Sequence, residues 1–138
     1  MSNCCVIGLG YIGLPTAVVL AEAGHKVLGV DVNKTIVDKI NKGNVHIFEP
    51  GLEDSLRNAV INGLIIAKTE PAKSDVFVIA VPTPFINDKN INEKNKIPKP
   101  NIEYVLSAAK SLAPFLDKGN LVIIESTIDE SFLWDALK

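Results

Sequence analysis

Apolar residues follow two different periods along this chain, and the switches between them delimit the expected elements. Compact apolar runs bounded by turn residues predict strands, whereas apolar residues three or four positions apart predict helices with one buried face. The predicted strands span residues 4–9, 26–31, 64–68, 76–81 and 120–125. The predicted helices span residues 11–23, 33–43, 52–63 and 101–116. Strands that alternate with helices favour an α/β fold built on a parallel sheet.

Two segments fall outside this alternation. Residues 84–100 are rich in Asn, Lys and Pro. Because structureless connections of this length are uncommon, we expect either a mobile connection or a lid over a binding site. In the tail, residues 127–130 have the pattern of a capping box and precede Phe132, Leu133, Trp134 and Leu137. This pattern predicts a last amphipathic helix, which could cover the edge of the final strand.

The first predicted strand opens into the most specific motif of the chain, Gly8-Leu9-Gly10-Tyr11-Ile12-Gly13. A helix pattern follows it, and the next predicted strand ends at Asp31. This arrangement is the fingerprint of a dinucleotide-binding βαβ unit. In it Gly8 makes the tight turn, Gly10 leaves room for a pyrophosphate, and Gly13 lets the helix lie close to the sheet. A strand-to-helix turn that binds no ligand is the alternative.

The acid at the end of the second strand indicates which dinucleotide is expected. The Asp31 carboxylate can accept hydrogen bonds from both hydroxyls of the adenosine ribose, and its charge would repel a 2′-phosphate. NAD is therefore expected rather than NADP, although Lys34 nearby weakens that exclusion. The amino end of the helix offers N–H groups and partial positive charge to the phosphates. We predict one dinucleotide-binding domain over residues 1–138, with a doubly wound parallel sheet of the Rossmann type and about five strands.

Composition and net charge limit the classes of partner that are expected. Hydrophobic residues make up 47% of the chain and charged residues 22%, as in ordinary soluble globular domains. A net charge of −2 gives no electrostatic reason to expect nucleic acid or an anionic membrane surface as a partner. No apolar stretch approaches the roughly 20 residues that span a bilayer, and the start lacks the pattern of a signal peptide. We therefore expect a cytoplasmic protein.

The cysteines and histidines are read as structural residues. Cys4 and Cys5 are adjacent on a predicted strand, so their side chains point to opposite faces and a mutual disulfide is not expected. Each should pack as a small apolar residue. His25 and His46 are isolated from each other and from any cluster of ligands, and His25 is expected in an exposed turn. No metal site is predicted.

Two more polar segments follow predicted strands. The prolines of Val81-Pro82-Thr83-Pro84 fix an extended exit from strand 76–81. Thr83 is then either presented to the cofactor or part of a rigid turn. In Glu125-Ser126-Thr127, Thr127 could supply a hydroxyl to the nicotinamide end, cap the last helix, or both. Because ligands of open α/β sheets bind at the carboxyl ends of the strands, these residues should converge with Gly8 and Asp31 on one edge.

Five motifs, in order, resemble those of the nucleotide-sugar dehydrogenases, which use two NAD to oxidise the C6 hydroxyl of a UDP-sugar to a carboxylate. The motifs are residues 8–17, 29–33, 49–52, 81–84 and 125–127. Residues 46–50, 81–85 and 111–114 are most similar to the UDP-N-acetyl-D-mannosamine dehydrogenase branch. The 49–52 segment is either a functional loop or a helix-entry turn.

The resemblance implies a set of cofactor contacts. Together with the fingerprint it gives Gly8, Gly10, Tyr11, Ile12, Gly13, Asp31, Thr83 and Thr127 as the residues that bind NAD. In the family the threonine that matches Thr127 also helps to position water or substrate, so Thr127 is an accessory catalytic candidate.

The resemblance ends near Thr127 and covers only the family's amino-terminal cofactor domain. The family's nucleophile is a cysteine in a Gly-x-Cys-x-Pro-Lys motif, assisted by a lysine, an asparagine and an aspartate, and no such motif is present here. The Pro and Gly that follow the threonine in the family are replaced by Ile128-Asp129-Glu130. We therefore expect a shortened chain, by natural truncation, a reading-frame accident or deliberate cutting.

Two functional hypotheses follow for such a chain. In the first, it is the NAD-binding half of an oxidoreductase that binds NAD weakly and turns over no UDP-sugar alone, so that a UDP-sugar is a partner only of a full-length parent. In the second, it is a non-enzymatic NAD-binding or dimerising module. Apolar surface exposed by the missing half could drive self-association in either case.

Overall fold

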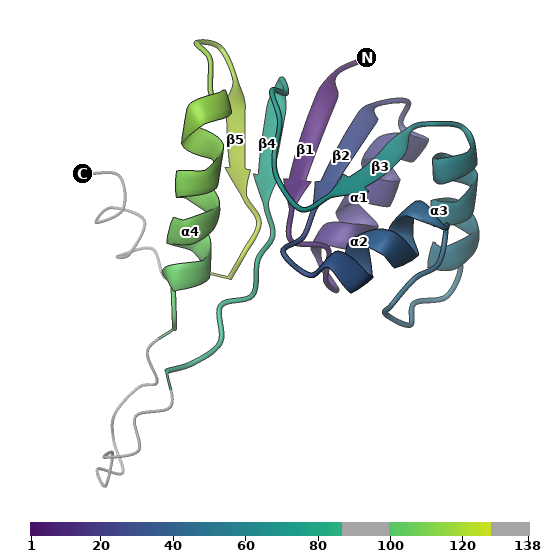
Figure 1. Ribbon diagram of the computed structural model, residues 1–138, viewed down its shortest axis with the longest axis horizontal. Helices are drawn as coiled ribbons and strands as arrows, with labels where there is room; N and C mark the ends of the chain where they lie inside the picture. Colours follow the sequence, from purple (N-terminus) through teal and green to yellow (C-terminus); the bar gives the residue numbers. More distant parts are fainter. Residues whose placement is uncertain (87–99, 128–138) are drawn as a thin grey trace, which may run out of the picture.

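A single sheet of five parallel strands organises the chain. The computed structural model describes residues 1–86 and 100–127, and the strand order is β3-β2-β1-β4-β5 (Figure 1). The strands are β1 (Asn3–Ile7), β2 (Lys26–Val30), β3 (Ile65–Lys68), β4 (Val76–Ile79) and β5 (Leu121–Ile124). The predicted parallel sheet and its strand number are confirmed, and the order is that of the Rossmann type.

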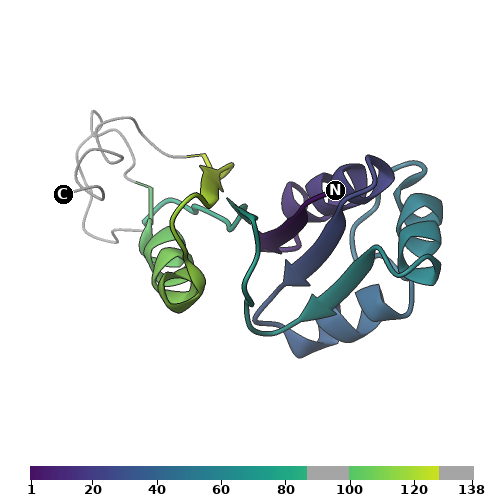
Figure 2. The same ribbon diagram turned by 90° about the horizontal axis from the view of Figure 1, so that it is seen from above.

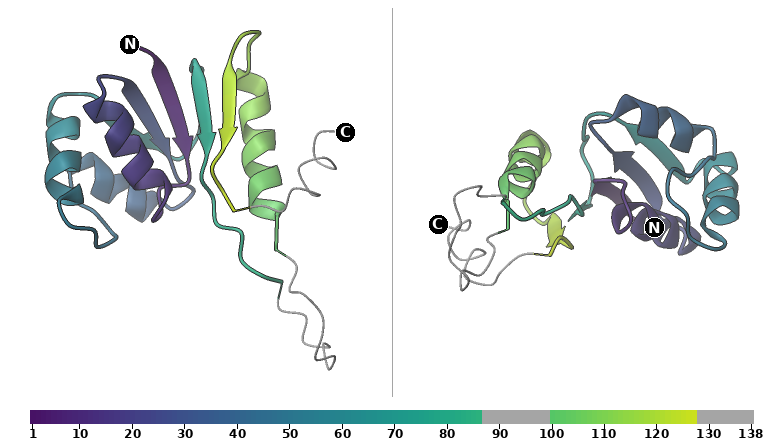
Figure 3. Two further views of the ribbon diagram at one scale, coloured as in Figure 1. Left: turned by 180° about the vertical axis from the view of Figure 1, so that it is seen from behind. Right: turned by 90° about the horizontal axis from the view of Figure 1, so that it is seen from below.

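Helices cover both faces of this sheet, so the predicted doubly wound arrangement is also confirmed. They are α1 (Gly13–Glu22), α2 (Lys34–Asn41), α3 (Leu52–Ile61) and α4 (Glu103–Leu112), the last extended by a 3₁₀ turn at Ala113–Phe115. Helices α1 and α3 pack on one face of the sheet, α2 lies beside the edge strand β3 and shares their hydrophobic core, and α4 packs on the other face beside β4 and β5 (Figures 1 and 2). Seen from behind, α4 stands apart from the other three helices (Figure 3).

The central strand β1 joins the two hydrophobic cores. Cys4 and Val6 point into the core under α1, α2 and α3, whereas Cys5 and Ile7 point into the core under α4. Both cysteines are buried and free, as predicted. In β4, Phe77, Val78 and Ile79 are all buried, so this strand is covered on both faces.

Local sequence signals set several element ends. Asn33 caps α2, since its side-chain oxygen accepts a hydrogen bond from the Thr35 N–H at 3.0 Å. Asn101 makes the same contact with the Glu103 N–H at 3.0 Å, just before α4. The helix predicted to about residue 116 changes type before its end: the α-helix stops at Leu112, because Pro114 has no N–H to continue it, and a 3₁₀ turn completes the segment to Phe115.

The remaining sequence predictions have mixed outcomes. The first helix begins at Gly13 and not at Tyr11, because the residues before it form the turn after β1. His25 is half-buried and accepts a hydrogen bond from the Ser2 N–H at 3.1 Å, so it is less exposed than expected. The predicted tail helix and residues 87–99 of the 84–100 segment lie outside the described residues. The two ends of that segment meet in an antiparallel bridge between Phe85 and Pro100.

The two edges of the sheet differ in how they are covered. At the β3 edge, the Asn41 side chain donates to the Ala67 carbonyl at 2.9 Å and accepts from the Ala67 N–H at 2.8 Å, as a neighbouring strand would. At the opposite edge, the apolar side chains of β5 are between 39% and 53% exposed. In the described part of the chain, no strand pairs with the outer side of β5.

The turn after β1 depends on Gly8. Its φ is +91°, and a Cβ at this position would lie 2.6 Å from the Ala80 carbonyl oxygen. Gly24, which follows the C-cap residue of α1, has the same φ of +91°, but a Cβ there would meet no atom within 4 Å. The two glycines therefore share a positive φ and differ in the space around them.

This difference predicts unequal costs for two substitutions. We expect Gly24→Ala to destabilise the fold by about 1 kcal/mol, the cost of a left-handed alanine. Gly8→Ala should cost about 1–3 kcal/mol more, because the new methyl group also forces β1 and β4 apart. Urea denaturation of both variants measures the difference in the free energy of unfolding. Equal losses would show that the contact with Ala80 is of no consequence.

Candidate functional site

The register of the sheet brings the chemically distinctive residues to one edge. Ile7 of β1 pairs with Val30 of β2 and with Ile79 of β4, and Ile79 pairs with Ile124 of β5. The residues that follow these positions, Gly8, Asp31, Ala80 and Glu125, are therefore at one level at the carboxyl ends of the strands. The predicted convergence on this edge is present.

The three glycines of the glycine-rich turn differ in the space around them. A Cβ on Gly13 would lie 1.7 Å from the Gly8 carbonyl oxygen, so only glycine lets α1 start this close to β1. A Cβ on Gly10 would meet no protein atom within 4 Å. Tyr11 and Ile12 lie between Gly10 and Gly13, and their exposed fractions are 71% and 54%. The protein's own packing thus requires Gly8 and Gly13, whereas Gly10 faces open space.

Asp31 is held against this turn by backbone hydrogen bonds. One carboxylate oxygen accepts from the Leu9 N–H at 3.1 Å, and the other accepts from the Asn33 N–H at 2.9 Å. Each oxygen keeps further lone pairs, so the carboxylate can also accept from ligand hydroxyls. Lys34, which weakened the sequence argument for NAD, bonds instead with Asp38 at 3.1 Å.

The two predicted threonines meet on the other side of the turn. The Thr83 hydroxyl donates to the Thr127 carbonyl at 2.7 Å, and the Ser126 hydroxyl donates to the Val81 carbonyl at 2.7 Å. These bonds tie the exit of β5 to the exit of β4. The oxygen of Thr83 can still accept a hydrogen bond, so it has capacity for a ligand.

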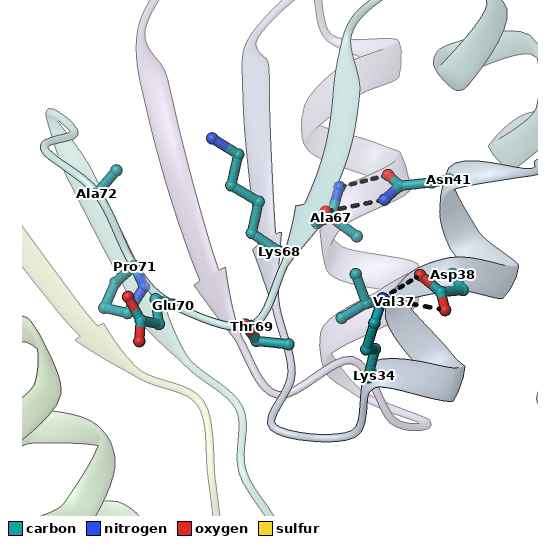
Figure 4. Close-up of a pocket in the computed structure, with 10 residues that line it drawn as sticks. All are labelled: Lys34, Val37, Asp38, Asn41, Ala67, Lys68, Thr69, Glu70, Pro71 and Ala72. Atoms are coloured by element: carbon teal, nitrogen blue, oxygen red, sulfur yellow. Dashed lines mark hydrogen bonds and ion pairs between the residues drawn. The ribbon is translucent and has the colours of Figure 1, made fainter.

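A polar hollow of about 520 Å³ adjoins the Asp31 side of this edge (Figure 4). It lies between α2 and the segment of residues 67–72 that leaves β3, and Lys34, Asp38, Asn41 and Lys68 are among its lining residues. The Asp31 N–H donates to the Lys68 carbonyl at 3.1 Å, which links the hollow to the acid. The hollow is formed by segments distant in sequence, so no local sequence pattern predicts it.

His46, which sequence spacing presents as isolated, lies in this region next to Asp31 and the glycine turn. Its Nδ1 is buried and has no hydrogen-bond partner among the described residues. Burial lowers the pKa of His46 below its ordinary value, and the Lys39 charge acts in the same direction. The Asp31 carboxylate and the Leu9 backbone act in the opposite direction. The segment before α3 therefore reaches the acid and the glycine turn, a tertiary contact that no sequence spacing reveals.

The thiols are remote from this chemistry. Both cysteines lie in β1, on the amino-terminal side of the residues that reach the carboxyl edge. Burial raises the pKa of Cys5 to about 11 and also raises the pKa of Cys4, where the charge of Asp75 adds to the effect. Because the thiolate is the nucleophilic form, neither side chain is suited to attack a substrate at neutral pH.

The described residues contain neither a cluster of metal ligands nor a membrane-spanning helix. Within residues 1–86 and 100–127, no three His, Cys, Asp or Glu side chains lie close enough to hold a metal ion. Over the same residues, no helix has the length and apolar character to cross a membrane.

The lowered pKa of His46 predicts how stability depends on pH. As the pH falls, His46 binds a proton at about pH 6.5 in the unfolded chain but only at a lower pH in the folded chain. Below about pH 6.5 the unfolded state therefore binds more protons, and the free energy of unfolding should decrease. His46→Gln should remove this part of the loss. Urea denaturation at several pH values between 8 and 5 measures it. A pH dependence that persists in His46→Gln and disappears in His25→Gln would assign the effect to the other histidine.

Comparison with known proteins gives the relationships of this fold and edge. Residues 2–131 match the NAD binding domain of the UDP-glucose/GDP-mannose dehydrogenase family. The chain is 52% identical to a UDP-N-acetyl-D-mannosamine dehydrogenase of Campylobacter jejuni over 123 residues, which are 89% of this chain and 28% of that protein. It is 49% identical to an NDP-N-acetyl-D-galactosaminuronic acid dehydrogenase of Ralstonia solanacearum over 88% of this chain and 27% of the relative.

Solved structures agree with this assignment. A UDP-N-acetyl-mannosamine dehydrogenase from Staphylococcus aureus superposes with a TM-score of 0.88 and 42% identity, over 97% of this chain and 30% of that one. The chain thus spans less than a third of the length of these relatives. NAD is the cofactor for which the matched domain is named. The chain belongs to the UDP-glucose/GDP-mannose dehydrogenase family and carries its NAD-binding domain.

Proposed function

We propose that this chain binds NAD at the carboxyl edge of its sheet as one dinucleotide-binding domain. The observation that carries the proposal is the open space in front of Gly10. No packing contact within the described residues requires a glycine at this position. A glycine that the fold does not need, between two that it does, leaves room for a ligand close to the backbone. The proposed contacts are Gly8, Gly10, Tyr11, Ile12, Gly13, Asp31, Thr83 and Thr127.

Each part of the edge has a distinct role in this proposal. Asp31 accepts hydrogen bonds from the adenosine ribose hydroxyls, and the glycine turn with the amino end of α1 receives the diphosphate. Thr83 and Thr127 contact the cofactor toward its nicotinamide end. When bound, NAD supplies the hydride acceptor of a dehydrogenase. The chain's own residues bind and orient it.

The oxidation itself is proposed for a longer protein that contains this domain. The 52% identity to a UDP-N-acetyl-D-mannosamine dehydrogenase supports UDP-N-acetyl-D-mannosamine as the substrate, oxidised at its C6 hydroxyl to the uronate. Thr127 would help there to position water or substrate. We propose a cytoplasmic reaction, because NAD and nucleotide sugars are cytoplasmic metabolites. The 138-residue chain alone should not complete the reaction, since its two cysteines are buried and protonated.

A second candidate is a non-enzymatic module that binds NAD or dimerises. The half-exposed apolar residues of β5 favour it, because an uncovered edge strand can pair with another molecule. Sedimentation analysis with and without NAD separates the two candidates. A dimer that forms only with NAD would favour the module, and a monomer under both conditions would favour the cofactor domain of a longer enzyme.

Calorimetric titration of NAD tests the proposed cofactor site. We expect a Kd between micromolar and millimolar, equivalent to about 4–8 kcal/mol. Gly10→Ala should abolish binding because its methyl group occupies the space proposed for the diphosphate. The same variant should unfold within about 1 kcal/mol of the parent chain, since the methyl group meets no protein atom. Asp31→Ala should also weaken binding. Unchanged affinity in Gly10→Ala would refute the proposed diphosphate site.

A turnover assay tests the proposal that this chain binds NAD but does not complete the oxidation alone. NAD and UDP-N-acetyl-D-mannosamine mixed with the 138-residue chain should yield no NADH absorbance. Measurable NADH would contradict the proposal that residues outside this chain complete the reaction.

A further inference from the structure

A polar link connects the first helix to the last strand. The Thr16 hydroxyl of α1 donates to the Glu125 carboxylate, with distances of 2.9 and 3.1 Å to its two oxygens. The two residues are 109 positions apart in the sequence. Thr16 is half-buried and Glu125 is exposed, so the link lies at the surface of the edge that carries the proposed site.

This link spans the two halves of the molecule. β4 lies between β1 and β5, and α1 packs in the core on the other side from α4. The β5 strand pairs only with β4 within the described residues. The Thr16–Glu125 link therefore adds a direct connection between the glycine-turn half and the β5 half, past the end of β4.

The three residues after β5 are each fixed to a different partner. Glu125 bonds with Thr16 of α1, the Ser126 hydroxyl bonds with the Val81 carbonyl at 2.7 Å, and the Thr127 carbonyl accepts from Thr83 at 2.7 Å. Of these three bonds, the Thr16–Glu125 bond is the one that connects residues 125–127 to α1. Removing it would leave Ser126 and Thr127 anchored to the exit of β4 alone.

We propose that Thr16 and Glu125 are positioning residues, which hold Thr127 at a fixed place relative to the amino end of α1 without touching the cofactor. The inference rests on the proposed NAD site, whose diphosphate and nicotinamide contacts lie on the two sides of the link. An exposed pair contributes little to overall stability. Its effect should therefore appear in binding of the nicotinamide end more than in unfolding.

A comparison of NAD with ADP-ribose, which lacks the nicotinamide, isolates this effect. We expect Thr16→Val and Glu125→Ala to weaken NAD binding by about 10-fold, the loss typical of one hydrogen bond. Both variants should bind ADP-ribose within about twofold of the parent chain, a change too small to represent a lost hydrogen bond. The conservative variants Thr16→Ser and Glu125→Gln should keep NAD affinity, because a hydroxyl donor and an oxygen acceptor remain. The double variant Thr16→Val/Glu125→Ala should bind NAD no more weakly than the weaker single variant.

Calorimetry with both ligands distinguishes the outcomes. Equal weakening of NAD and ADP-ribose, or unchanged NAD affinity in Thr16→Val and Glu125→Ala, would overturn the positioning role while the NAD site stands. A parent chain that binds NAD no more tightly than ADP-ribose would overturn it in the same way. A parent chain that binds neither ligand would instead refute the proposed function, and the positioning role with it. Asp31→Ala serves as the control, since it should weaken both ligands together.

Discussion

The burial of β1 on both faces is the constraint on which the rest of the structure depends. Its side chains alternate between two cores, and its backbone pairs with β2 on one side and β4 on the other. Because successive side chains of a strand point to opposite faces, a slip of one residue would exchange the two cores. The same register fixes where β1 ends, and so places Gly8 beside Asp31 and Ala80.

The edge that follows from this register is built by tertiary contacts between short connections. The turn after β1 is closed by the approach of Gly8 to Ala80, and Asp31 is fixed by N–H groups from Leu9 and Asn33. The exits of β4 and β5 are joined by side-chain hydroxyls. The sheet therefore supplies a rigid platform, and a few polar bonds set the relative positions of the connections above it.

Local patterns in the sequence were sufficient for most of the fold and for part of the site. The glycine spacing, the acid after the second strand and the Asn33 cap act over a few residues, so they can be read from the chain directly. Helical spacing alone predicts that α1 starts near Tyr11, but it does not reveal the turn at Tyr11 and Ile12, and the helix begins at Gly13. The contacts of His46, Asn41 and Glu125 could not be predicted, since each depends on residues that only the folded chain brings together.

The two edges of the sheet differ in their capacity to pair with a further strand. Asn41 occupies the hydrogen-bonding groups of Ala67 on β3, whereas β5 offers an apolar outer edge. A sheet that is closed by a side chain at one edge and unpaired at the other can accept a further strand only beside β5, so any added strand, from this chain or from another molecule, is directed to that edge.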